Sequence, residues 1–324
     1  MSFYIKDLEI KKSVILAPMA GITSFSYRKF LSEFGVGATY SEMISDCGLI
    51  YNNKKTIEMM KNDSNFNRPY GIQLFGGSKE SLLKGLEVIE NSNIEYDFLD
   101  LNLACPVPKV TKGNGGSKWL TKLDEMYEMV KAVVEKSKKP VTAKVRLGWK
   151  SVDIEKICVL LEKAGVSLIA IHPRTRNQLY TGCARYELIK NIKEKMKIPL
   201  AISGDIFTLE QAIEYQKMTG ADFIMVARGA LGNPFLVTQI ATYFKTGEIL
   251  PSPTLKQNLN YLKEHFEKLI SLKGEETATK EMRGIAPHYL KGYPNTKAIR
   301  NLLATQMKTY QDFLTIISSL NEID

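Results

Sequence analysis

The chain has 324 residues, of which 44% are hydrophobic and 24% are charged, a composition typical of soluble globular proteins. Its formal net charge of +9 permits an anionic partner such as nucleic acid without requiring one. Four scattered cysteines without CxxC spacing and only three histidines argue against a metal centre and for a reducing, cytoplasmic setting. The charged first residues lack the apolar core of a secretory signal, and no apolar run is long enough to cross a bilayer, so we expect no membrane association.

Short β-rich runs alternate along the chain with segments of helical periodicity. The runs begin at Val14, Ala38, Tyr70, Phe98, Val141, Leu168, Pro199 and Phe223. Between the fifth and sixth runs, Ile154, Ile157 and Leu161 follow helical spacing and Gly165 ends the pattern. Cys158 lies on the same face and is therefore expected to pack rather than to react. Eight βα units predict an α/β fold, a (β/α)₈ TIM barrel, and the lack of a GxGxxG motif after the first run disfavours a doubly wound sheet.

A proline-containing stretch, "TGEILPSPT", follows the eighth unit and is typical of a linker. An amphipathic helix is expected after it, and a last helix is expected to carry the apolar positions between Ile299 and Ile317. We therefore predict a barrel domain over residues 1–245 and an all-helical domain over residues 246–324.

In a TIM barrel the residues at the carboxyl ends of the strands converge on one site. The candidates are Pro18, Met19 and Ala20 after the first run, Gln73 in the third, Asn102 and Cys105 in and after the fourth, Lys144 in the fifth, His172, Arg174 and Arg176 in and after the sixth, Ser203, Gly204 and Asp205 after the seventh, and Ala227 and Arg228 after the eighth. The last two groups read "SGD" and "ARG", at the strands where barrels commonly hold a phosphate. The alternative is that these glycines only form tight turns.

Lys144 interrupts an otherwise apolar run, and an inward lysine needs a partner because burying its charge alone is costly. That partner is either a structural carboxylate, for example Glu42, or an anionic cofactor. Gln73 suits a heterocycle with donor and acceptor edges, although buried glutamines satisfied within the protein are equally common. A phosphate site, an amide and a lysine at one barrel mouth fit flavin mononucleotide (FMN) better than a nicotinamide.

Cys105 follows the fourth run and precedes a basic, glycine-rich segment. A free thiol is mostly protonated near neutral pH, and no histidine neighbours this one in sequence, so it suits a proton donor better than a thiolate nucleophile. The alternative is a small buried hydrophobic residue. Lys109, Lys112 and Lys118 follow without an intervening acid, and we expect a mobile loop that closes over an anionic substrate.

The combination of "APMAGIT", "DLNLACPVPKV", "AKVRLGW", "IHPRTR", "SGDI" and "ARGALGNPF" in this order resembles the tRNA-dihydrouridine synthases. The resemblance implies an FMN enzyme that reduces uridine in tRNA to 5,6-dihydrouridine with NADPH or NADH, with hydride passing from FMN N5 to C6 and a proton from Cys105 to C5. It implies that Asn102 holds the uracil and leaves the contacts of Arg174 and Arg176 open between phosphate and ring. The resemblance implies that FMN is bound by Pro18, Met19, Ala20, Gln73, Lys144, Ser203, Gly204, Asp205, Ala227 and Arg228, with His172 as a weaker candidate.

The resemblance also makes the helical tail the tRNA-holding part, where "KEMRGIAPHYLKGYPNTKAIR" is rich in basic residues, and it implies no stable protein partner. The alternative for this stretch is an ordinary solvated helical face. Departures from the family pattern, "SGD" for "NGD" and "HPRTR" for "HGRTR", bear on phosphate geometry. Two rival functions remain: an FMN barrel dehydrogenase of the dihydroorotate type that acts on a free pyrimidine, and a redox-silent RNA-binding barrel.

Overall fold

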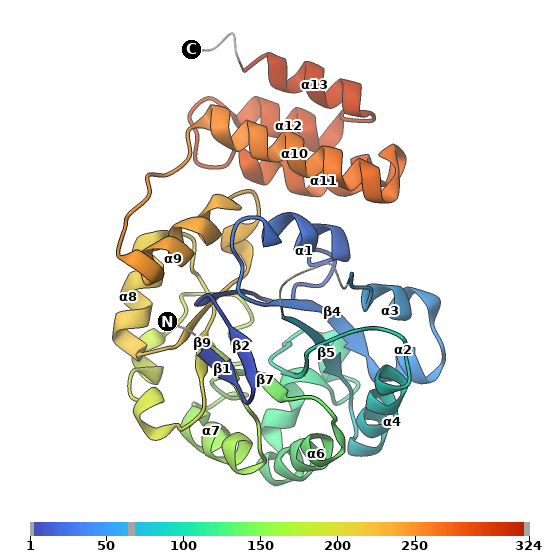
Figure 1. Ribbon diagram of the computed structural model, residues 1–324, viewed down its shortest axis with the longest axis vertical. Coiled ribbons are helices and arrows are strands. Elements are labelled where there is room, and N and C mark those ends of the chain that lie inside the picture. The colour runs from blue at the N-terminus through green and yellow to red at the C-terminus, as the bar shows by residue number, and fades with distance from the viewer. Residues whose placement is uncertain (1–2, 64–68, 321–324) are drawn as a thin grey trace.

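Eight parallel strands form the predicted barrel in the computed structural model, which describes residues 3–63 and 69–320 (Figure 1). The strands are β3 (Val14–Leu16), β4 (Thr39–Ser45), β5 (Tyr70–Phe75), β6 (Phe98–Leu103), β7 (Val141–Arg146), β8 (Ile169–His172), β9 (Leu200–Ile202) and β10 (Phe223–Val226). Their order is β3-β10-β9-β8-β7-β6-β5-β4. A parallel bridge between Ile15 of β3 and Ala38, directly before β4, joins the first and last strands of this order and closes the barrel. All eight predicted strands are thereby confirmed.

Side chains alternate between the two sides of each barrel strand, which explains where the polar residues lie. On β6, Leu99 and Leu101 belong to the large core between strands and helices, whereas Phe98 belongs to a separate cluster inside the barrel. Asp100 and Asn102 share the inward face of Phe98. The lower part of the barrel interior is therefore apolar and its upper part, toward the carboxyl ends of the strands, is polar.

A short N-terminal hairpin, which the sequence analysis did not predict, lies across one end of the barrel (Figure 1). It pairs β1 (Phe3–Ile5) with β2 (Leu8–Ile10) in antiparallel register. Ile5 and Ile10 join the apolar cluster inside the barrel. The hairpin therefore covers the end of the barrel that lies opposite the polar strand ends.

An α-helix follows each strand of the barrel except β8, and these helices surround the barrel. They are α1 (Phe25–Ser32), α2 (Asp46–Ile50), α3 (Lys54–Met59), α4 (Lys79–Glu90), α5 (Pro108–Thr111), α6 (Leu123–Lys136), α7 (Ile154–Lys163), α8 (Leu209–Thr219) and α9 (Phe235–Thr246). A capping box of Thr208 and Gln211 begins α8. Between β8 and β9 the described chain forms only two 3₁₀-helices, so the expected sixth βα unit has no α-helix there.

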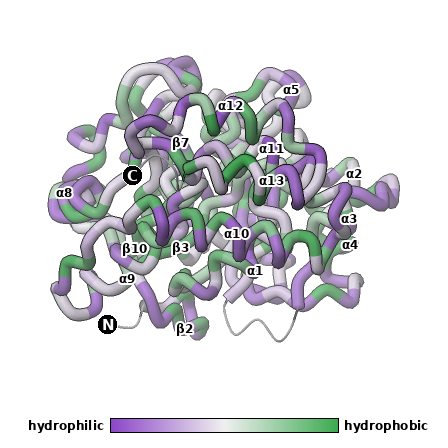
Figure 2. Tube along the Cα trace, turned by 90° about the horizontal axis from the view of Figure 1, so that it is seen from above, coloured by the Kyte–Doolittle hydropathy of each residue, from purple (hydrophilic) through white to green (hydrophobic). Residues whose placement is uncertain are grey.

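Four helices follow the linker and stack on one side of the barrel (Figure 1). They are α10 (Leu255–Lys273), α11 (Glu275–Tyr289), α12 (Lys297–Thr305) and α13 (Tyr310–Ser318). The single last helix expected from the sequence is in fact two, because a capping box of Thr309 and Asp312 starts a new helix. Seen from above, α10 and α13 alternate hydrophilic and hydrophobic positions, as helices do that bury one face (Figure 2).

The helical region contacts the barrel mainly through α1, α10 and the segment after β10. The ring of His265 stacks on Phe30 with centroids 4.4 Å apart, and Lys268 forms an ion pair with Glu33. Asn258 Nδ2 donates to the carbonyl of Gly232 at 3.0 Å. Burial lowers the pKa of His265 to about 3, so the imidazole stays neutral in this interface. Within the described residues, no helix is long and apolar enough to span a membrane.

Candidate active site

The carboxyl ends of the barrel strands surround a cavity of about 380 Å³, within the range of small-ligand pockets. Its lining contains the predicted catalytic and cofactor residues and one of the predicted substrate residues. These are Pro18, Met19, Ala20, Gln73, Asn102, Cys105, Lys144, His172, Ser203, Gly204, Asp205, Ala227 and Arg228. The structure thus brings together residues from seven strands, while Arg174 and Arg176 lie outside this lining.

Eleven of the 24 lining residues were missing from the predicted site, among them the side chains of Met43, Arg146, Tyr180 and Phe207. Arg146 could have been found, because it follows Lys144 by two positions on β7 and so shares its inward face. Its Nε donates to the carbonyl of Ala104 at 2.9 Å. Tyr180 and Phe207 come from loops, and their position in the sequence carries no comparable signal.

Lys144 is a buried cation in this cavity. It has no hydrogen-bond or ion-pair partner among the described residues, and the alternative partner Glu42 instead accepts from the backbone N–H of Gly21. Burial and, to a smaller extent, the charge of Arg146 lower the pKa of Lys144 to about 8, against the opposing charge of Asp100. The ammonium group is therefore available to an anionic ligand.

Cys105 is held at the cavity wall by its backbone. Asn102 Oδ1 accepts the N–H of Cys105 at 2.9 Å, and Ser117 donates to the Cys105 carbonyl from its N–H at 3.1 Å and from its hydroxyl at 2.9 Å. Gly116 has a φ of +59°, and a Cβ there would lie 2.7 Å from that carbonyl oxygen. Burial raises the pKa of the Cys105 thiol, so the sulfur carries a proton at neutral pH.

The glycine-rich segment after Cys105 is packed, not extended over the cavity. It forms α5 and a 3₁₀-helix over Gly116–Thr121, and Trp119 Nε1 donates to the carbonyl of Gly76 at 2.9 Å. Gly77 lies so close to Gly113 that a Cβ would come within 1.9 Å of its carbonyl oxygen. The structure does not support the expected mobile loop, because close backbone contacts fix it against the end of β5.

The predicted phosphate site lies where β9 and β10 end. Gly204 has a φ of +117°, and a Cβ there would come within 2.5 Å of His172, while one on Gly229 would come within 2.0 Å of the Ile206 carbonyl oxygen. These glycines therefore have a packing reason of their own, so they do not by themselves decide for phosphate. Half of the Arg228 side chain is exposed at this corner, where it faces the cavity.

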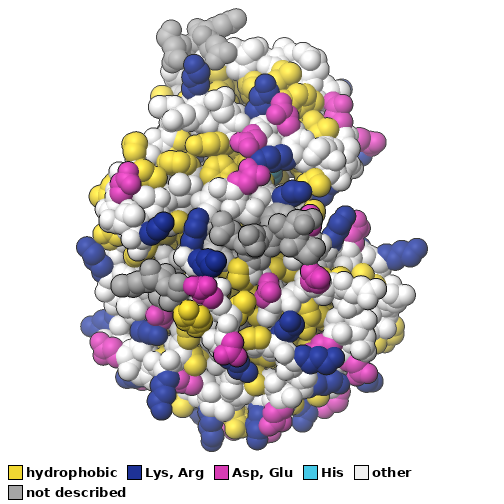
Figure 3. Space-filling view, in the orientation of Figure 1, with side chains coloured by type: hydrophobic (Ala, Val, Ile, Leu, Met, Phe, Trp, Pro, Cys, Tyr) yellow, Lys and Arg dark blue, Asp and Glu magenta, His cyan; other side chains and the backbone are white. Residues whose placement is uncertain are grey.

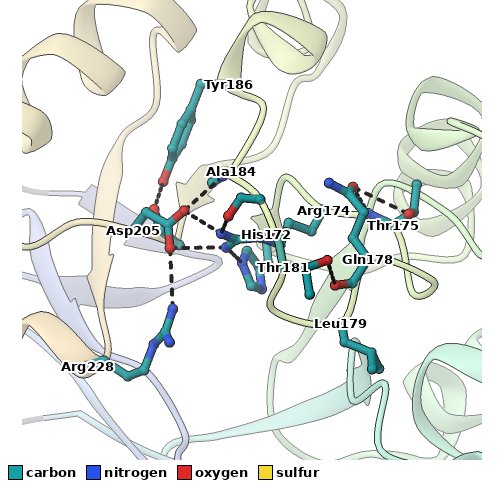
Figure 4. A network of polar contacts seen from close by, with 12 residues as sticks. His172, Arg174, Thr175, Gln178, Leu179, Thr181, Ala184, Tyr186, Asp205 and Arg228 are labelled. Atoms are coloured by element: carbon teal, nitrogen blue, oxygen red, sulfur yellow. Dashed lines mark hydrogen bonds and ion pairs between the residues drawn. The ribbon is translucent and has the colours of Figure 1, made fainter.

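Arg174 and Asp205 form the centre of a buried network beside this corner (Figure 4). Arg174 Nη2 lies 2.6 Å from Asp205 Oδ2, and its Nη1 donates to Asp205 Oδ1 and contacts His172 Nε2, each at 3.1 Å. Its remaining N–H groups donate to the carbonyls of Thr181 and Gly182. All five N–H groups of a guanidinium are then used, so the geometry does not support the predicted contact between Arg174 and substrate.

The same network constrains its neighbours. Asp205 also accepts from the N–H of Ala184 and from Arg228, so both of its oxygens are occupied. Burial would raise the pKa of Asp205, but its hydrogen bonds with Arg174 and Ala184 outweigh burial and hold that pKa below its usual value. Burial, reinforced by the surrounding cations, lowers the pKa of His172 far below its usual value, so the imidazole is neutral.

Arg176 lies on the rim outside the cavity, against an aromatic ring. Its guanidinium carbon is 4.4 Å from the centroid of Trp149, and Lys118 Nζ is 5.0 Å from the same centroid. Neither cation forms an ion pair with a carboxylate of the described residues. We call these three residues, Lys118, Trp149 and Arg176, the rim cluster.

Eight parallel strands around a cavity at their carboxyl ends define a TIM-barrel protein, and solved structures agree. The chain superposes with a TM-score of 0.55 on a 6-hydroxypseudooxynicotine amine oxidase from Pseudomonas geniculata, over 74% of this chain and 48% of that one. For a histamine dehydrogenase from Rhizobium the TM-score is 0.54, over 82% and 50%. Sequence identities of 14% and 13% limit these similarities to the fold.

The sequence identifies the family within this class. The family model described as Dihydrouridine synthase (Dus) matches residues 15–321. A probable tRNA-dihydrouridine synthase of Rickettsia bellii is 33% identical over 301 residues, 91% of each chain. The tRNA-dihydrouridine synthase B of Pseudomonas aeruginosa is 34% identical over 289 residues, 89% of this chain and 86% of that one. The chain belongs to the dihydrouridine synthase family, which confirms the resemblance found in the sequence.

Proposed function

We propose that this protein reduces specific uridines of tRNA to 5,6-dihydrouridine, with FMN bound in the cavity and NADPH or NADH as the source of electrons. The observation that carries the proposal is that an ammonium group without a partner in the described part of the chain, Lys144, and a protonated thiol, Cys105, share one cavity. A lysine and a thiol in these states suit a reduction that needs an anion stabilised and a proton delivered. A bound flavin would supply the hydride.

The cavity fits such a cofactor on physical grounds. Burying the Lys144 charge without a partner is unfavourable, so an anionic ligand would compensate a cost that the protein alone leaves standing. Ser203, Gly204, Ala227 and Arg228 would hold the phosphate, with Asp205 limited to backbone contact because its carboxylate is occupied. The residues that would hold the ring are Pro18, Met19, Ala20, Gln73, Lys144 and His172.

Cys105 is the proposed proton donor. The C5=C6 bond of uracil is conjugated to the C4 carbonyl. Addition of hydride at C6 therefore leaves a negative charge shared between C5 and the C4 carbonyl oxygen, and a proton added at C5 neutralises it. The raised thiol pKa keeps that proton on Cys105 until it is needed. Asn102, whose side chain lines the cavity beside Cys105, is proposed to bind the uracil.

Two surfaces support tRNA as the substrate. The rim cluster presents two cations without carboxylate partners among the described residues, next to the loop that holds Cys105. The helical region adds the basic residues of α11 and α12, including Arg283 and Arg300. On the face with the β1–β2 hairpin, opposite the cavity, basic and acidic side chains are mixed (Figure 3). We therefore propose that tRNA approaches from the cavity side, with the target base turned out of its stack.

The decisive experiment compares tRNA from cells with and without the gene, with dihydrouridine mapped by mass spectrometry. We expect one or more positions to lose dihydrouridine, which would identify substrate and site together and place the enzyme with cytoplasmic tRNA. The purified protein should carry flavin absorbance, which a redox-silent RNA-binding barrel would lack. Turnover on free uracil or uridine in place of tRNA would favour the free-pyrimidine alternative. An unchanged dihydrouridine map together with a flavin-free protein would refute the proposal.

A further inference from the structure

One buried carboxylate beneath the cavity has no role in the site described so far. Asp100 lies on the inward face of β6, directly between Gln73 of β5 and Thr142 of β7, and is fully buried. Its Oδ2 accepts from Gln73 Nε2 at 2.6 Å, and its Oδ1 accepts from the Thr142 hydroxyl at 2.6 Å. It does not line the cavity. Burial raises its pKa to about 6, which leaves it ionised at neutral pH.

A continuous chain of hydrogen bonds runs from Asp100 to the backbone of Cys105. Gln73 Oε1 accepts from Asn102 Nδ2 at 2.8 Å. Asn102 Oδ1 then accepts the N–H groups of Cys105 at 2.9 Å and Ala104 at 3.2 Å. Every member of this chain is buried, so each misplaced donor or acceptor would be left unsatisfied.

The direction of this chain is set at the Asp100 end. An ionised carboxylate can only accept hydrogen bonds, so the Gln73 amide must turn its NH₂ group toward Asp100. The Gln73 oxygen then faces Asn102, which must present its own NH₂ group. The Asn102 oxygen is left to accept from Cys105, as observed. An inverted Gln73 amide would instead place two oxygens against each other.

We propose that Asp100 is a positioning residue that fixes the orientation of the Gln73 and Asn102 amides and, through them, the backbone of Cys105. The cavity thereby receives amide N–H groups in a defined orientation next to a thiol whose loop is held in place. This inference deepens the proposed function, since both amides are assigned there to flavin and uracil. Its physical content concerns only this chain and can be tested without turnover.

The test compares Asp100→Leu, which removes the acceptor, with two matched variants. Asp100→Asn keeps an oxygen toward Gln73 and turns its NH₂ group to the Thr142 hydroxyl, which can accept. Thr142→Val removes the other hydrogen bond of the same carboxylate and leaves Gln73 untouched. Hydrogen exchange, resolved by mass spectrometry, follows the backbone amides of Ala104 and Cys105, and iodoacetamide labelling follows the Cys105 sulfur. Each variant is compared with wild-type protein brought to the same flavin content, without tRNA.

We expect Asp100→Leu to accelerate both exchange at Ala104–Cys105 and labelling of Cys105 by about tenfold, the effect of losing one buried hydrogen bond. Asp100→Asn and Thr142→Val should stay within about twofold of wild type, although Thr142→Val also loses a buried hydrogen bond. Wild-type rates in folded Asp100→Leu would overturn the proposal. Equal acceleration in Thr142→Val, or failure of Asp100→Asn to restore the rates, would overturn it too.

If Asp100→Leu does not fold, the double variant Asp100→Leu with Gln73→Leu replaces both polar partners by apolar groups, a change that proteins tolerate better. It still leaves Asn102 without its acceptor, so the same acceleration is expected and wild-type rates would overturn the proposal. Absence of flavin or of uridine reduction would refute the proposed function alone, because the exchange and labelling rates report on the hydrogen-bond chain in either case.

Discussion

Arg174 and Arg228 contact the same carboxylate, yet the structure predicts different roles for them. Arg174 is 2% exposed and lies 2.6 Å from Asp205, whereas Arg228 is 50% exposed and lies 3.3 Å away. Removing one partner of a buried ion pair costs about 3–5 kcal/mol, while an exposed pair contributes about 0–1 kcal/mol. Because the Asp205 side chain is itself 19% exposed, we expect Arg174→Met to cost about 3 kcal/mol and Arg228→Met less than about 1 kcal/mol.

Thermal and urea unfolding of the two variants measures this difference. With an unfolding entropy of about 2.1 cal/mol/K per residue, about 3 kcal/mol corresponds to a fall of about 4 °C in Tm for a chain of 324 residues. Flavin affinity should follow the opposite order, because Arg228 faces the cavity and Arg174 does not. Arg228→Met should therefore weaken flavin binding at nearly unchanged stability. Equal stability of the two variants would refute the assignment of Arg174 as a structural anchor.

The dependence on pH provides a second check on the same pair. Arg174 helps to hold the pKa of Asp205 below its usual value in the folded state. This stabilisation is fully present above the unfolded carboxyl pKa of about 4 and is lost as the pH falls through the lower folded pKa. The difference in unfolding free energy between wild type and Arg174→Met should therefore be largest at neutral pH and shrink below about pH 4. A constant difference from pH 7 to pH 3 would contradict the ion-pair explanation.

Three further predictions concern the chemistry and the substrate. Cys105→Ala should retain flavin but slow the oxidation of reduced protein by tRNA about 10²- to 10⁴-fold in single-turnover kinetics; an unchanged rate would exclude the thiol as proton donor. Turnover should decline above about pH 8, where Lys144 loses its proton, and Lys144→Arg should remove this decline at a lower maximal rate; a decline that persists in the variant would assign it to another group. Trp149→Ala and Arg176→Gln should weaken tRNA binding without changing flavin binding, and Arg176→Gln, which removes a charge, should also reduce the salt dependence of binding. Lys139→Gln, before β7 at the opposite end of the barrel, should leave tRNA binding and its salt dependence unchanged; equal effects in all three would mean that the rim cluster has no special role.

The strands and the cavity could be predicted because both follow from local patterns. Short β-rich runs between helical segments mark the strands. The carboxyl ends of parallel strands in a barrel must meet, so residues as far apart in the sequence as Met19 and Arg228 could be placed in one site. The same rule places Lys144 inward. The protonated state of the Cys105 thiol was expected from its residue type and from the lack of a neighbouring histidine, and its burial, which raises the thiol pKa, agrees with that expectation; its role as proton donor stays a prediction.

Other features depend on contacts that no local pattern records. The three-residue strands of the N-terminal hairpin are too short for periodicity to show. Arg174 was assigned to substrate because it follows a strand end, but its partner Asp205 is 31 residues away and captures its guanidinium. The glycines of the segment after Cys105 suggested mobility, whereas they permit close backbone contacts with the end of β5.

The segment from Arg228 to Gly232 faces the cavity at its first residue and contacts the helical region at its last residue. Arg228 faces the cavity, while four residues later the carbonyl of Gly232 accepts from Asn258 of α10, and a Cβ on Gly232 would come within 2.3 Å of the His288 backbone. Cutting the chain after α9 would thus strip the support from one wall of the ligand pocket and uncover the aromatic surface of α1. We therefore predict that the pocket needs the terminal helices to keep its shape, and that the barrel and the helical region unfold in a single transition.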